Sequence, residues 1–519
     1  MIEELRDPRC YPNAPHDVRI VQTHLSVVCI TDDVVYKLKK AIALPFADFT
    51  TLAARRHMCR EEVRLNRRLC PDTYLGTASL RRDGGRLVFS AIDADDRDDD
   101  LDVAVVMRRL PQERMLDELL QDGDVTRDEV EGLAALVAEF HAGADRGEQA
   151  RSNGDPDKLA AFAADNFTDL KQVADHGLHV PLLDATAAAS ARDFRALLPA
   201  LRERCAAGRV VDGHGDLHAR NVCMTSPPTV YDCIEFEPAF RCGDVATEVA
   251  FLTMDLRYRG APELARAFTR AYVNASGDDA LPRLLPTLES YRAMVRAKVA
   301  AMAAAEPELR EQDRAASRVS ARRHLWLAAR TAIETRGPWW VVVCGPPASG
   351  KSRLAARLAE ASSWPHLATD VTRKQLAGLA PTEHAAPEHY TREFSDRTYD
   401  AVFAAAARAT RDGGPVVLLD GNFATEARRA AAAAAARDVG AQLSVAFVHV
   451  DVETARVRAA ARRHDRGNVS DADVDVTDEL HAAFVPPTSD EARLLARLDG
   501  TSATDDLVDE LLTAMLAGA

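Results

Sequence analysis

The stretch VVDGHGDLHARNVCM, at residues 210–224, places two histidines, two aspartates and an asparagine between short apolar segments. Such side chains can ligate a metal through imidazoles, or they can handle a proton beside a bound cation. His214 and His218 have the i, i+4 spacing of two metal ligands on one helix face. Gly213 and Gly215 disfavour a regular helix here, and the sequence offers no third imidazole or thiolate in a cluster. A zinc site is therefore the weaker interpretation.

Asp216 and Asn221 form the other polar pair of this stretch. A carboxylate can accept the proton of an attacking hydroxyl, and an amide oxygen can bind Mg²⁺. With the preceding histidine, the spacing H-x-D-x4-N is that of the catalytic loop of the kinase fold. The form HGDLHxxN resembles the loop of aminoglycoside and choline phosphotransferases, and this resemblance covers most of residues 20–335. It implies that Asp216 orients the acceptor hydroxyl and that Asn221 binds Mg²⁺.

The same resemblance implies further parts in a fixed order along the chain. A strand lysine for the ATP phosphates is matched by Lys37 in VVYKLKK, with Lys39 on the same strand face as the alternative. A helix glutamate that pairs with this lysine is matched by Glu62 in REEVRLNRRL, with Glu61 as the alternative. The segment VVMRRLP, at 105–111, has the apolar strand and the break expected of a hinge between two lobes.

The metal-binding acid after the loop departs from the family's pattern. In YDCIEFEPAFRCGDVATEVAFL, aligning I-E-F with the family's I-D-F places Glu235 at the metal, with Asp232 as the alternative. An acidic wall in this part of the chain would favour a cationic amino-sugar, whereas a buried network would explain the same acids within the fold. The acids concerned are Glu235, Glu237, Asp244, Glu248 and Asp255.

A second candidate site is VVVCGPPASGKS, at residues 341–352. Its G-x4-G-K-S pattern follows an apolar strand and precedes the helical segment RLAARLAEA, the context that makes this motif specific. Glycines let backbone N–H groups turn toward phosphates, and the helix N-terminus adds positive potential. We expect Lys351 to reach the β- and γ-phosphates of ATP and the Ser352 hydroxyl to bind Mg²⁺. The predicted nucleotide-binding residues here are Gly345, Ala348, Ser349, Gly350, Lys351, Ser352 and Arg353.

Two further segments complete this second site. The apolar strand 416–419 ends in Asp420, which we expect to support the metal, and ATDVTRKQLAGL contains Asp370 and Arg373. The latter segment resembles the AAA_33/zeta-toxin-like family of P-loop kinases. The resemblance implies that Asp370 takes the proton of the acceptor hydroxyl and that Arg373 holds substrate or phosphate. Without the family, the alternative is a helix cap followed by a solvated arginine.

Downstream, several arginines precede the sequence NVSDA, where the family has a lid with arginines followed by an SDA element. An arginine that closes over the γ-phosphate stabilises the charge of the transition state. Arg458 and Arg462 are the predicted nucleotide-binding residues of this lid, and a solvated basic helix face is the alternative for Arg463 and Arg466.

These motifs require two different scaffolds. The N-terminal part has strand-like segments, a helix at 50–70, more strands to about residue 109 and mostly helices afterwards. From RGPWW onward strands and helices alternate, which implies a parallel sheet covered on both faces. The predicted fold class is therefore an α+β bilobal protein-kinase-like domain, residues 1–335, followed by an α/β P-loop domain with a parallel sheet, residues 336–519.

Composition bounds what the protein does. The chain has 519 residues, enough for two domains, and its formal net charge of −15 argues against a nucleic-acid-binding surface spread over the whole molecule. It contains no run of 18 apolar residues, and its nine cysteines include no CxxC pair, so we expect a cytoplasmic protein without a membrane segment. The acidic run DADDRDDDLD, at 93–102, is interpreted as a solvated hairpin loop.

Joined in one chain, the two parts resemble the bacterial family described as bifunctional aminoglycoside phosphotransferase/ATP-binding proteins. The resemblance implies an ATP- and Mg²⁺-dependent phosphotransferase with two nucleotide sites, acting on the hydroxyl of a small molecule such as an amino-sugar, an aminoglycoside-like compound or another sugar. One alternative is a single active P-loop kinase with a regulatory kinase-like N-terminal domain. Another is a nucleotide-dependent ATPase switch that has no small acceptor.

Overall fold

A computed structural model of the chain describes residues 2–23, 25–44, 47–173, 177–380, 383–462 and 474–518. The chain divides into two compact units. The first unit comprises Met1–Ala161 and Leu197–Leu288, and the second comprises Phe162–Ala196 and Glu289–Ala519. The predicted boundary near residue 335 falls between α11 (Glu311–Glu334) and β13 (Trp339–Cys344), and it stays a prediction for the limits of the two domains.

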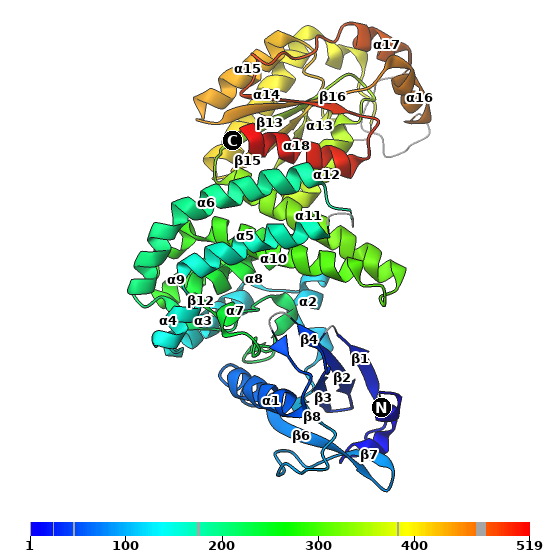
Figure 1. The fold of residues 1–519 in the computed structure, drawn as a ribbon. Helices are drawn as coiled ribbons and strands as arrows, with labels where there is room; N and C mark the ends of the chain where they lie inside the picture. Colours follow the sequence, from blue (N-terminus) through cyan, green and yellow to red (C-terminus); the bar gives the residue numbers. More distant parts are fainter. Residues whose placement is uncertain are drawn as a thin grey trace. The chain divides into compact units, whose positions relative to one another are not determined.

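The first unit begins with an antiparallel sheet of six strands in the order β1-β2-β3-β8-β6-β7 (Figure 1). Strands β3 (Val34–Lys39) and β8 (Asp102–Arg108) form the middle of the sheet, and half of β3 and the first five residues of β8 are buried, as expected for central strands. Their register places Lys37 opposite Val105. The other strands are β1 (Arg19–Gln22), β2 (Ser26–Ile30), β6 (Tyr74–Asp83) and β7 (Arg86–Phe89).

Helix α1 (Leu52–Asn66) covers one face of this sheet. Thr51 caps its N-terminus, with the threonine hydroxyl accepting from the N–H of Ala54. Cys59 and Val63 on the helix pack with apolar side chains of β6 and β8 in one buried cluster. This packing presents Glu62, one residue before Val63, toward the strand lysines.

The remainder of the first unit is mainly helical and supports the catalytic-loop segment. Strand β9 (Val210–Asp212) pairs antiparallel with β12 (Cys242–Asp244), so the loop that follows β9 is tied to the start of α8 (Val245–Tyr258). Another short pair, β10 (Val222–Cys223) with β11 (Thr229–Val230), closes the far end of the loop. The surrounding helices are α2 (Leu116–Asp122), α3 (Arg127–Gly143), α4 (Glu148–Asn153), α7 (Pro238–Arg241) and α9 (Pro262–Ser276).

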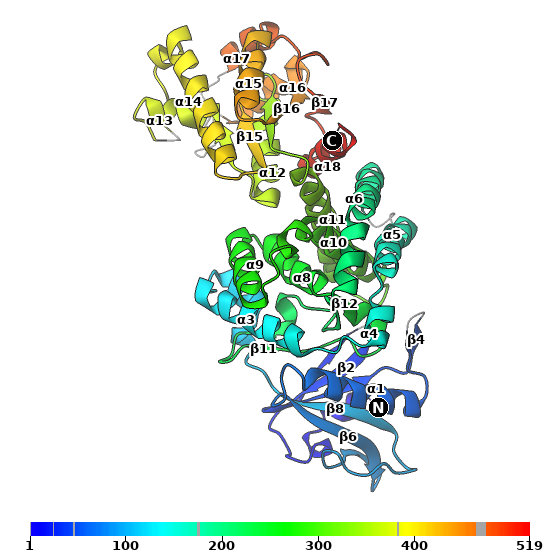
Figure 2. The same cartoon turned by 90° about the vertical axis from the view of Figure 1, so that its left-hand side faces the viewer.

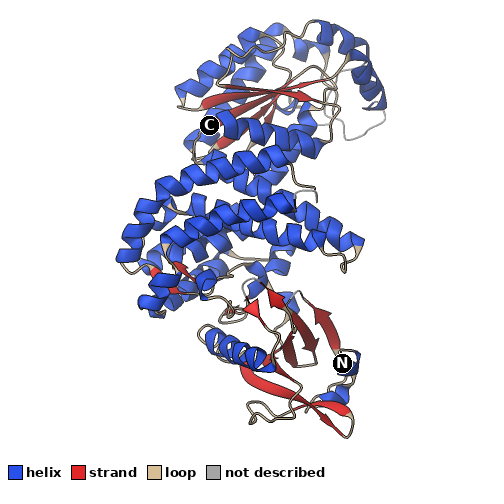
Figure 3. Ribbon diagram, viewed as in Figure 1, coloured by secondary structure: helices blue, strands red, loops and turns tan. Residues whose placement is uncertain are grey.

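The second unit contains a parallel sheet of five strands in the order β14-β15-β13-β16-β17 (Figure 2). Every residue of β13 and of β15 (Val416–Asp420) is buried, as expected for central strands covered on both faces. Figure 3 shows this sheet in red between blue helices. The other strands are β14 (His366–Ala368), β16 (Gln442–His449) and β17 (Leu494–Asp499). This arrangement confirms the predicted α/β P-loop fold.

Helices α14 (Arg392–Arg411) and α15 (Glu426–Asp438) cover one face of the parallel sheet, and α12 (Lys351–Ser362) and α18 (Thr504–Gly518) cover the other (Figure 1). The remaining helices of this unit's sheet region are α13 (Thr369–Leu376), α16 (Val452–Arg462) and α17 (Val474–Ala482).

Helix α11 packs against α18 in the second unit. The Trp326 indole N–H donates to the buried Asp509 carboxylate at 2.5 Å, and Arg322 forms an ion pair with the same carboxylate at 2.6 Å. Sequence alone assigns this helix to the kinase-like domain, whereas its buried polar contacts join it to the last helix of the P-loop fold. The limits between the two units fall inside three further helices, which are α5 (Pro156–Gln172), α6 (Val180–Ala206) and α10 (Leu285–Ala305). Among the described residues, no helix has both the length and the apolar character needed to cross a membrane.

Candidate active sites

The loop after β9 brings Asp216 and Asn221 into contact. The Asn221 Nδ2 donates to the backbone carbonyl of Asp216 at 2.9 Å and to its Oδ2 at 3.0 Å. The Asp216 side chain is 31% exposed, and the Nε2 of His218 lies 3.3 Å from its Oδ2. A carboxylate that can accept a proton is therefore held at an accessible position by an amide and an imidazole.

A buried carboxylate accepts hydrogen bonds from the backbone of this loop. Glu248 on α8 accepts from the N–H of Gly215 at 2.7 Å and from the N–H of His214. Its other oxygen lies 2.8 Å from the Nε2 of His141, whose Nδ1 contacts the Tyr272 hydroxyl. Burial alone would raise the pKa of Glu248, but the hydrogen bonds from His141 and the loop N–H groups lower it to about 2. Gly215 has φ 84°, a left-handed conformation that favours glycine.

Lys37 pairs with two carboxylates from distant parts of the chain. Its Nζ lies 2.9 Å from Glu62 Oε1 on α1 and 2.5 Å from Asp232 Oδ1. The Lys37 side chain is 16% exposed and that of Asp232 is 42% exposed, so both groups can meet a ligand. Glu61, the alternative to Glu62, instead pairs with Arg64 at 2.7 Å.

Lys39 lies deeper than Lys37 and contacts the other oxygen of Glu62, at 2.7 Å. It also forms an ion pair with Glu235. The Lys39 and Glu235 side chains are 3% and 7% exposed, and that of Glu62 is fully buried. Burial alone would raise the pKa of Glu62, but Lys37 and Lys39 together lower it to about 2. The five groups form one chain of alternating charge in which Glu62 is the middle member.

The two candidate metal-binding acids therefore occupy different environments. Glu235 lies inside the fold against Lys39, whereas Asp232 is accessible and contacts Lys37. Asp232 also has φ 65°, an uncommon conformation for a residue other than glycine, and such positions cluster at functional sites. Asn221 is tied to the same place, because its carbonyl accepts from the N–H of Tyr231 at 3.0 Å.

The acids that could have formed a wall for a cationic acceptor are used within the fold. Asp244 accepts from Arg204 at 2.7 and 2.8 Å, and Asp255 accepts from Arg259 at 3.1 Å. Glu237 caps α7 by accepting from the N–H of Ala239 at 2.9 Å. With Glu235 and Glu248 engaged as described above, four of the five carboxylates are buried and paired within the fold, and only Glu237 is partly exposed.

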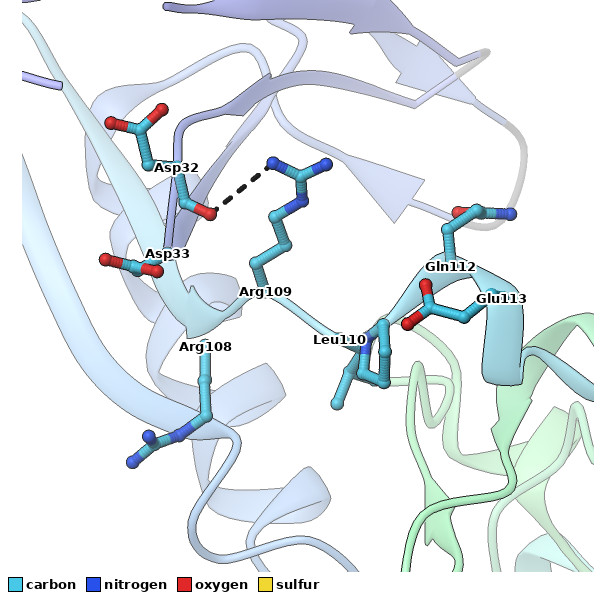
Figure 4. Close-up of a pocket in the computed structure, with 8 residues that line it drawn as sticks. Asp32, Asp33, Arg108, Arg109, Leu110, Gln112 and Glu113 are labelled. Carbon is cyan, nitrogen blue, oxygen red and sulfur yellow. Dashed lines mark hydrogen bonds between the residues drawn. The ribbon is translucent and has the colours of Figure 1, made fainter. Parts of the chain in front are cut away.

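A cavity of about 630 Å³ lies at the predicted hinge (Figure 4). The turn between β2 and β3 and residues 108–113 line it. The Arg109 guanidinium donates to the backbone carbonyls of Thr31 at 3.1 Å and Asp32 at 3.4 Å, which ties the end of β8 to this turn. The hinge segment thus has a hollowed surface, lined mostly by polar residues, at one end of the two middle strands of the first unit's sheet.

In the second unit, the G-x4-G-K-S motif forms the loop between β13 and α12, which begins at Lys351. A Cβ at Gly345 would lie 2.2 Å from the carbonyl oxygen of Val448, so this close approach requires glycine. The Ser352 hydroxyl donates to Asp420 Oδ1 at 3.1 Å. The structure therefore brings together the two predicted metal-supporting oxygens, which lie 68 residues apart in the sequence.

His366 is a contact of this site that has no motif in the sequence. Its Nε2 lies 3.3 Å from Asp420 Oδ2, the oxygen that does not face Ser352. The signal that could have revealed it is strand order, because β14 pairs with β15 in a register that places Ala368 opposite Asp420. That order cannot be read from a single sequence.

The remaining predicted residues of the second site differ in what the structure shows. Asp370 lies in the first turn of α13, and Arg373, one turn later, is buried. Arg353 is exposed on α12. The Arg458 guanidinium donates to the backbone carbonyls of Ser349 at 3.3 Å and Gly500 at 2.9 Å. Its side chain therefore contacts the backbone of the predicted phosphate-binding loop at Ser349.

Part of the predicted lid is outside the described residues. Arg462 is the last residue of α16, but its side chain is not described. Arg463, Arg466 and the SDA element also lie outside the described residues. Among the residues that are described, no group of three or more His, Cys, Asp or Glu side chains could hold a metal ion. A cation shared with ATP phosphates needs only one or two protein oxygens of the kind found in both units.

Comparison with known proteins defines the class. Residues 80–286 match the model of the phosphotransferase enzyme family, and residues 341–487 match that of an AAA domain, AAA_33. The two matches follow each other along the chain in the order that the sequence predicts, and they agree with a kinase-like fold followed by a P-loop fold. The first match begins after Lys37 and Glu62, so the place of these two residues in the site comes from the structure.

Relatives that match over most of this chain come from mycobacteria. Uncharacterized proteins of Mycobacterium bovis and Mycobacterium tuberculosis are 29% identical over 472 residues, covering 90% of this chain and 89% of each relative. Among solved structures, a gluconokinase from Sinorhizobium meliloti is 20% identical, covers 35% of this chain and 92% of its own, and has a TM-score of 0.26. A sugar kinase from Janibacter is 16% identical, covers 35% and 98%, and has a TM-score of 0.27. At these TM-scores the likeness supports no functional statement.

Proposed function

We propose that this protein is an ATP- and Mg²⁺-dependent phosphotransferase with two nucleotide sites, each of which phosphorylates a hydroxyl of a small molecule. The observation that supports it most is the charge chain of the first unit. Lys37, Glu62 and Asp232 come together in it from three separate segments. The backbone hydrogen bond from the Tyr231 N–H to the Asn221 carbonyl joins these charged residues to the catalytic loop.

In the first unit, Asp216 accepts the proton of the acceptor hydroxyl while Asn221 and His218 hold its carboxylate. The acceptor oxygen forms a bond to the γ-phosphorus as the bond between the β–γ bridging oxygen and that phosphorus breaks, and ADP leaves. Lys37, kept in place by Glu62, neutralises phosphate charge. Asp232 and Asn221 supply the oxygen ligands that Mg²⁺ prefers, and a bound Mg²⁺ would neutralise the phosphate oxygens.

In the second unit, the phosphate-binding loop and Lys351 hold the ATP phosphates, and Asp370 accepts the proton of the second acceptor. Ser352 and Asp420 present hydroxyl and carboxylate oxygens 3.1 Å apart, a donor set that fits Mg²⁺. His366 fixes the second oxygen of Asp420, which leaves the first directed at Ser352. Catalysis at both sites rests on positioning and charge stabilisation.

A single active kinase with a regulatory N-terminal unit is the alternative that Glu235 suggested. An accessible carboxylate, Asp232, stands beside the strand lysine and removes the main reason for that alternative. The two-site proposal therefore accounts for more of the structure than either a regulatory unit or a simple ATPase switch.

The test is ATP turnover over a panel of sugars, aminoglycosides and nucleoside sugars, with Asp216→Asn and Lys351→Met measured separately. Each substitution should abolish a different acceptor-dependent activity and leave the other. If Asp216→Asn changes nothing while Lys351→Met removes all turnover, the first unit is not an enzyme. Turnover that no acceptor stimulates would instead support an ATPase switch.

A further inference from the structure

Arg373 on α13 is a buried cation without a carboxylate partner. Its residue is 7% exposed, it forms no ion pair with any described residue, and its Nε has no hydrogen-bond partner among them. Arg429, a buried arginine of the same unit, shows the usual arrangement, since its Nη2 donates to Glu491 Oε1 at 3.1 Å. A guanidinium removed from water and left without an anion is costly, and proteins normally pair it.

Neutral groups hold the Arg373 guanidinium in a fixed position. Its Nη1 donates to the backbone carbonyl of His389 at 2.6 Å and to the Ser395 hydroxyl at 3.2 Å. Its Cζ lies 4.7 Å from the centroid of the Tyr390 ring, and Tyr390 is itself 45% exposed. These contacts orient the guanidinium, and none of them supplies a negative charge.

The surroundings are those of the proposed acceptor site. Asp370, the proposed base, lies one helical turn before Arg373 on α13. A second guanidinium, that of Arg428 at the start of α15, stacks on Tyr399 at 4.5 Å and pairs with Asp396. Burial raises the pKa of Tyr399, and the charges of Arg428, Asp370 and Arg373 also influence it, so all three groups lie within electrostatic range of this ring.

We propose that the acceptor of the P-loop unit carries an anionic group, and that Arg373 binds this group while Asp370 faces the hydroxyl that is phosphorylated. The inference rests on the proposed kinase function of this unit and names its substrate class. A planar guanidinium matches the paired oxygens of a carboxylate or of a phosphate, so the ligand chemistry is that of a polyhydroxy acid or of a sugar phosphate. A bound anion would supply the partner that Arg373 lacks in the fold.

Binding of matched compounds to the full chain in the absence of ATP tests the proposal. Isothermal titration with glucose, gluconate and glucose 6-phosphate compares a neutral polyol with its carboxylate and its phosphate ester. At least one anion should bind the wild type tenfold or more tightly than glucose does, and the stronger of the two identifies the anion. Titrations in Lys351→Met remove phosphate binding at the nucleotide loop, so binding that persists there is assigned to Arg373.

Arg373→Met should abolish the preference for the anion, and Arg373→Lys should keep part of it because the charge remains. Arg397→Met is the matched control, since Arg397 stacks on Phe394 at 5.2 Å, is exposed and lies on the neighbouring α14. Circular dichroism checks that each variant is folded, and Arg373→Lys keeps the test valid if Arg373→Met is not.

Four results would overturn the proposal. They are equal binding of glucose and both anions, absence of binding by all three compounds, an equal loss of anion binding in Arg373→Met and Arg397→Met, and an anion affinity in Arg373→Met equal to that of the wild type. Because anion binding is measured without ATP, it can be interpreted even if the P-loop unit is not a kinase. Failure of the kinase function would appear only in the turnover assays.

Discussion

The two candidate sites differ in how their parts are held. In the second unit, one short loop between β13 and α12 contains most of the proposed nucleotide-binding groups, and its shape is set by backbone geometry. In the first unit, Lys37, Glu62 and Asp232 come from three segments, and ion pairs hold them together. One site is local and held by backbone conformation, and the other is distributed and held by charge.

This difference has a physical consequence. A loop held by backbone conformation keeps its shape when a neighbouring side chain is neutralised, because its hydrogen bonds remain. A chain of buried charges loses its balance when one member is removed, because the adjacent charge is left without a partner. Substitutions of single charges should therefore affect the fold in the first unit and mainly catalysis in the second.

The buried pair of Lys39 and Glu235 should show the largest effect. Lys39→Met leaves Glu235 buried without a partner and should lower the free energy of unfolding by about 3–5 kcal/mol. The double variant Lys39→Met/Glu235→Leu should recover most of this loss, because both charges are gone. Far-UV circular dichroism during urea unfolding measures the change.

The chain offers an internal reference for this measurement. All four tryptophans, at 326, 339, 340 and 364, belong to the second unit, so tryptophan fluorescence should keep its wild-type transition. Arg64→Met removes an ion pair that is 57% exposed on its arginine side and should cost less than about 1 kcal/mol. A Lys39→Met variant as stable as Arg64→Met would contradict the buried charge chain.

The proposed metal-binding carboxylates allow a direct comparison of the two sites. Asp232→Asn and Asp420→Asn should each lower the rate of their own site by on the order of 10²–10³-fold, since bound metal contributes several kcal/mol of charge stabilisation. Acceptor-dependent turnover at saturating ATP and varied Mg²⁺ measures both. If Asp232→Asn retains full activity with unchanged Mg²⁺ dependence, the metal site of the first unit lies elsewhere.

Sequence predicts these two sites to different depths. The loop at 345–352 needs only a strand, glycines and a helix start, all of which are adjacent in the chain, and the parallel sheet follows from regular alternation. The partners of Lys37 and Lys39 depend on how α1 packs and on the backbone turn at Asp232, which no local pattern specifies. Aligning the motif favours Glu235 as the metal ligand. In the fold, however, Glu235 is buried in an ion pair with Lys39, and Asp232 is the accessible carboxylate.

The carboxylate under the catalytic loop predicts a dependence of stability on pH. The pKa of Glu248 is lowered from 4.5 to about 2 in the fold, so its contribution is complete above about pH 4.5 and is lost as the pH falls toward 2. The loss amounts to about 3 kcal/mol. Urea midpoints of the first unit should fall across this window in the wild type and change less in Glu248→Gln. An equal slope in both proteins would contradict this role.

The contact of His366 with Asp420 predicts a moderate effect on the second site. His366→Ala should lower its activity by roughly 10–100-fold, as loss of a residue that orients a metal ligand usually does. His366→Asn, which can still donate a hydrogen bond, should retain more activity. A weaker apparent affinity for Mg²⁺ in both variants, with the first unit's activity unchanged, distinguishes orientation of Asp420 from a general loss of folding.

The acidic run at 93–102 gives the smallest effect and the finest test of the comparison. It is not simply a solvated loop, because Asp100 is buried and pairs with Arg56 of α1 at 2.9 Å, and Asp96 pairs with Arg60 of α1 at 2.8 Å. The loop thus fastens the helix that carries Glu62. The Arg60 side chain is 56% exposed, so Arg60→Gln should cost less than about 1 kcal/mol.

If charge holds the first site together, even this surface pair should influence it. Turnover of the first unit should fall slightly as salt rises from 0.05 to 0.5 M, since salt screens exposed pairs, and Arg60→Gln should remove part of that dependence. Turnover of the second unit, measured under the same conditions, provides the control for salt effects on ATP and acceptor. Equal salt dependence at both sites would mean that the arginines of α1 fasten the acidic loop without affecting the position of Glu62.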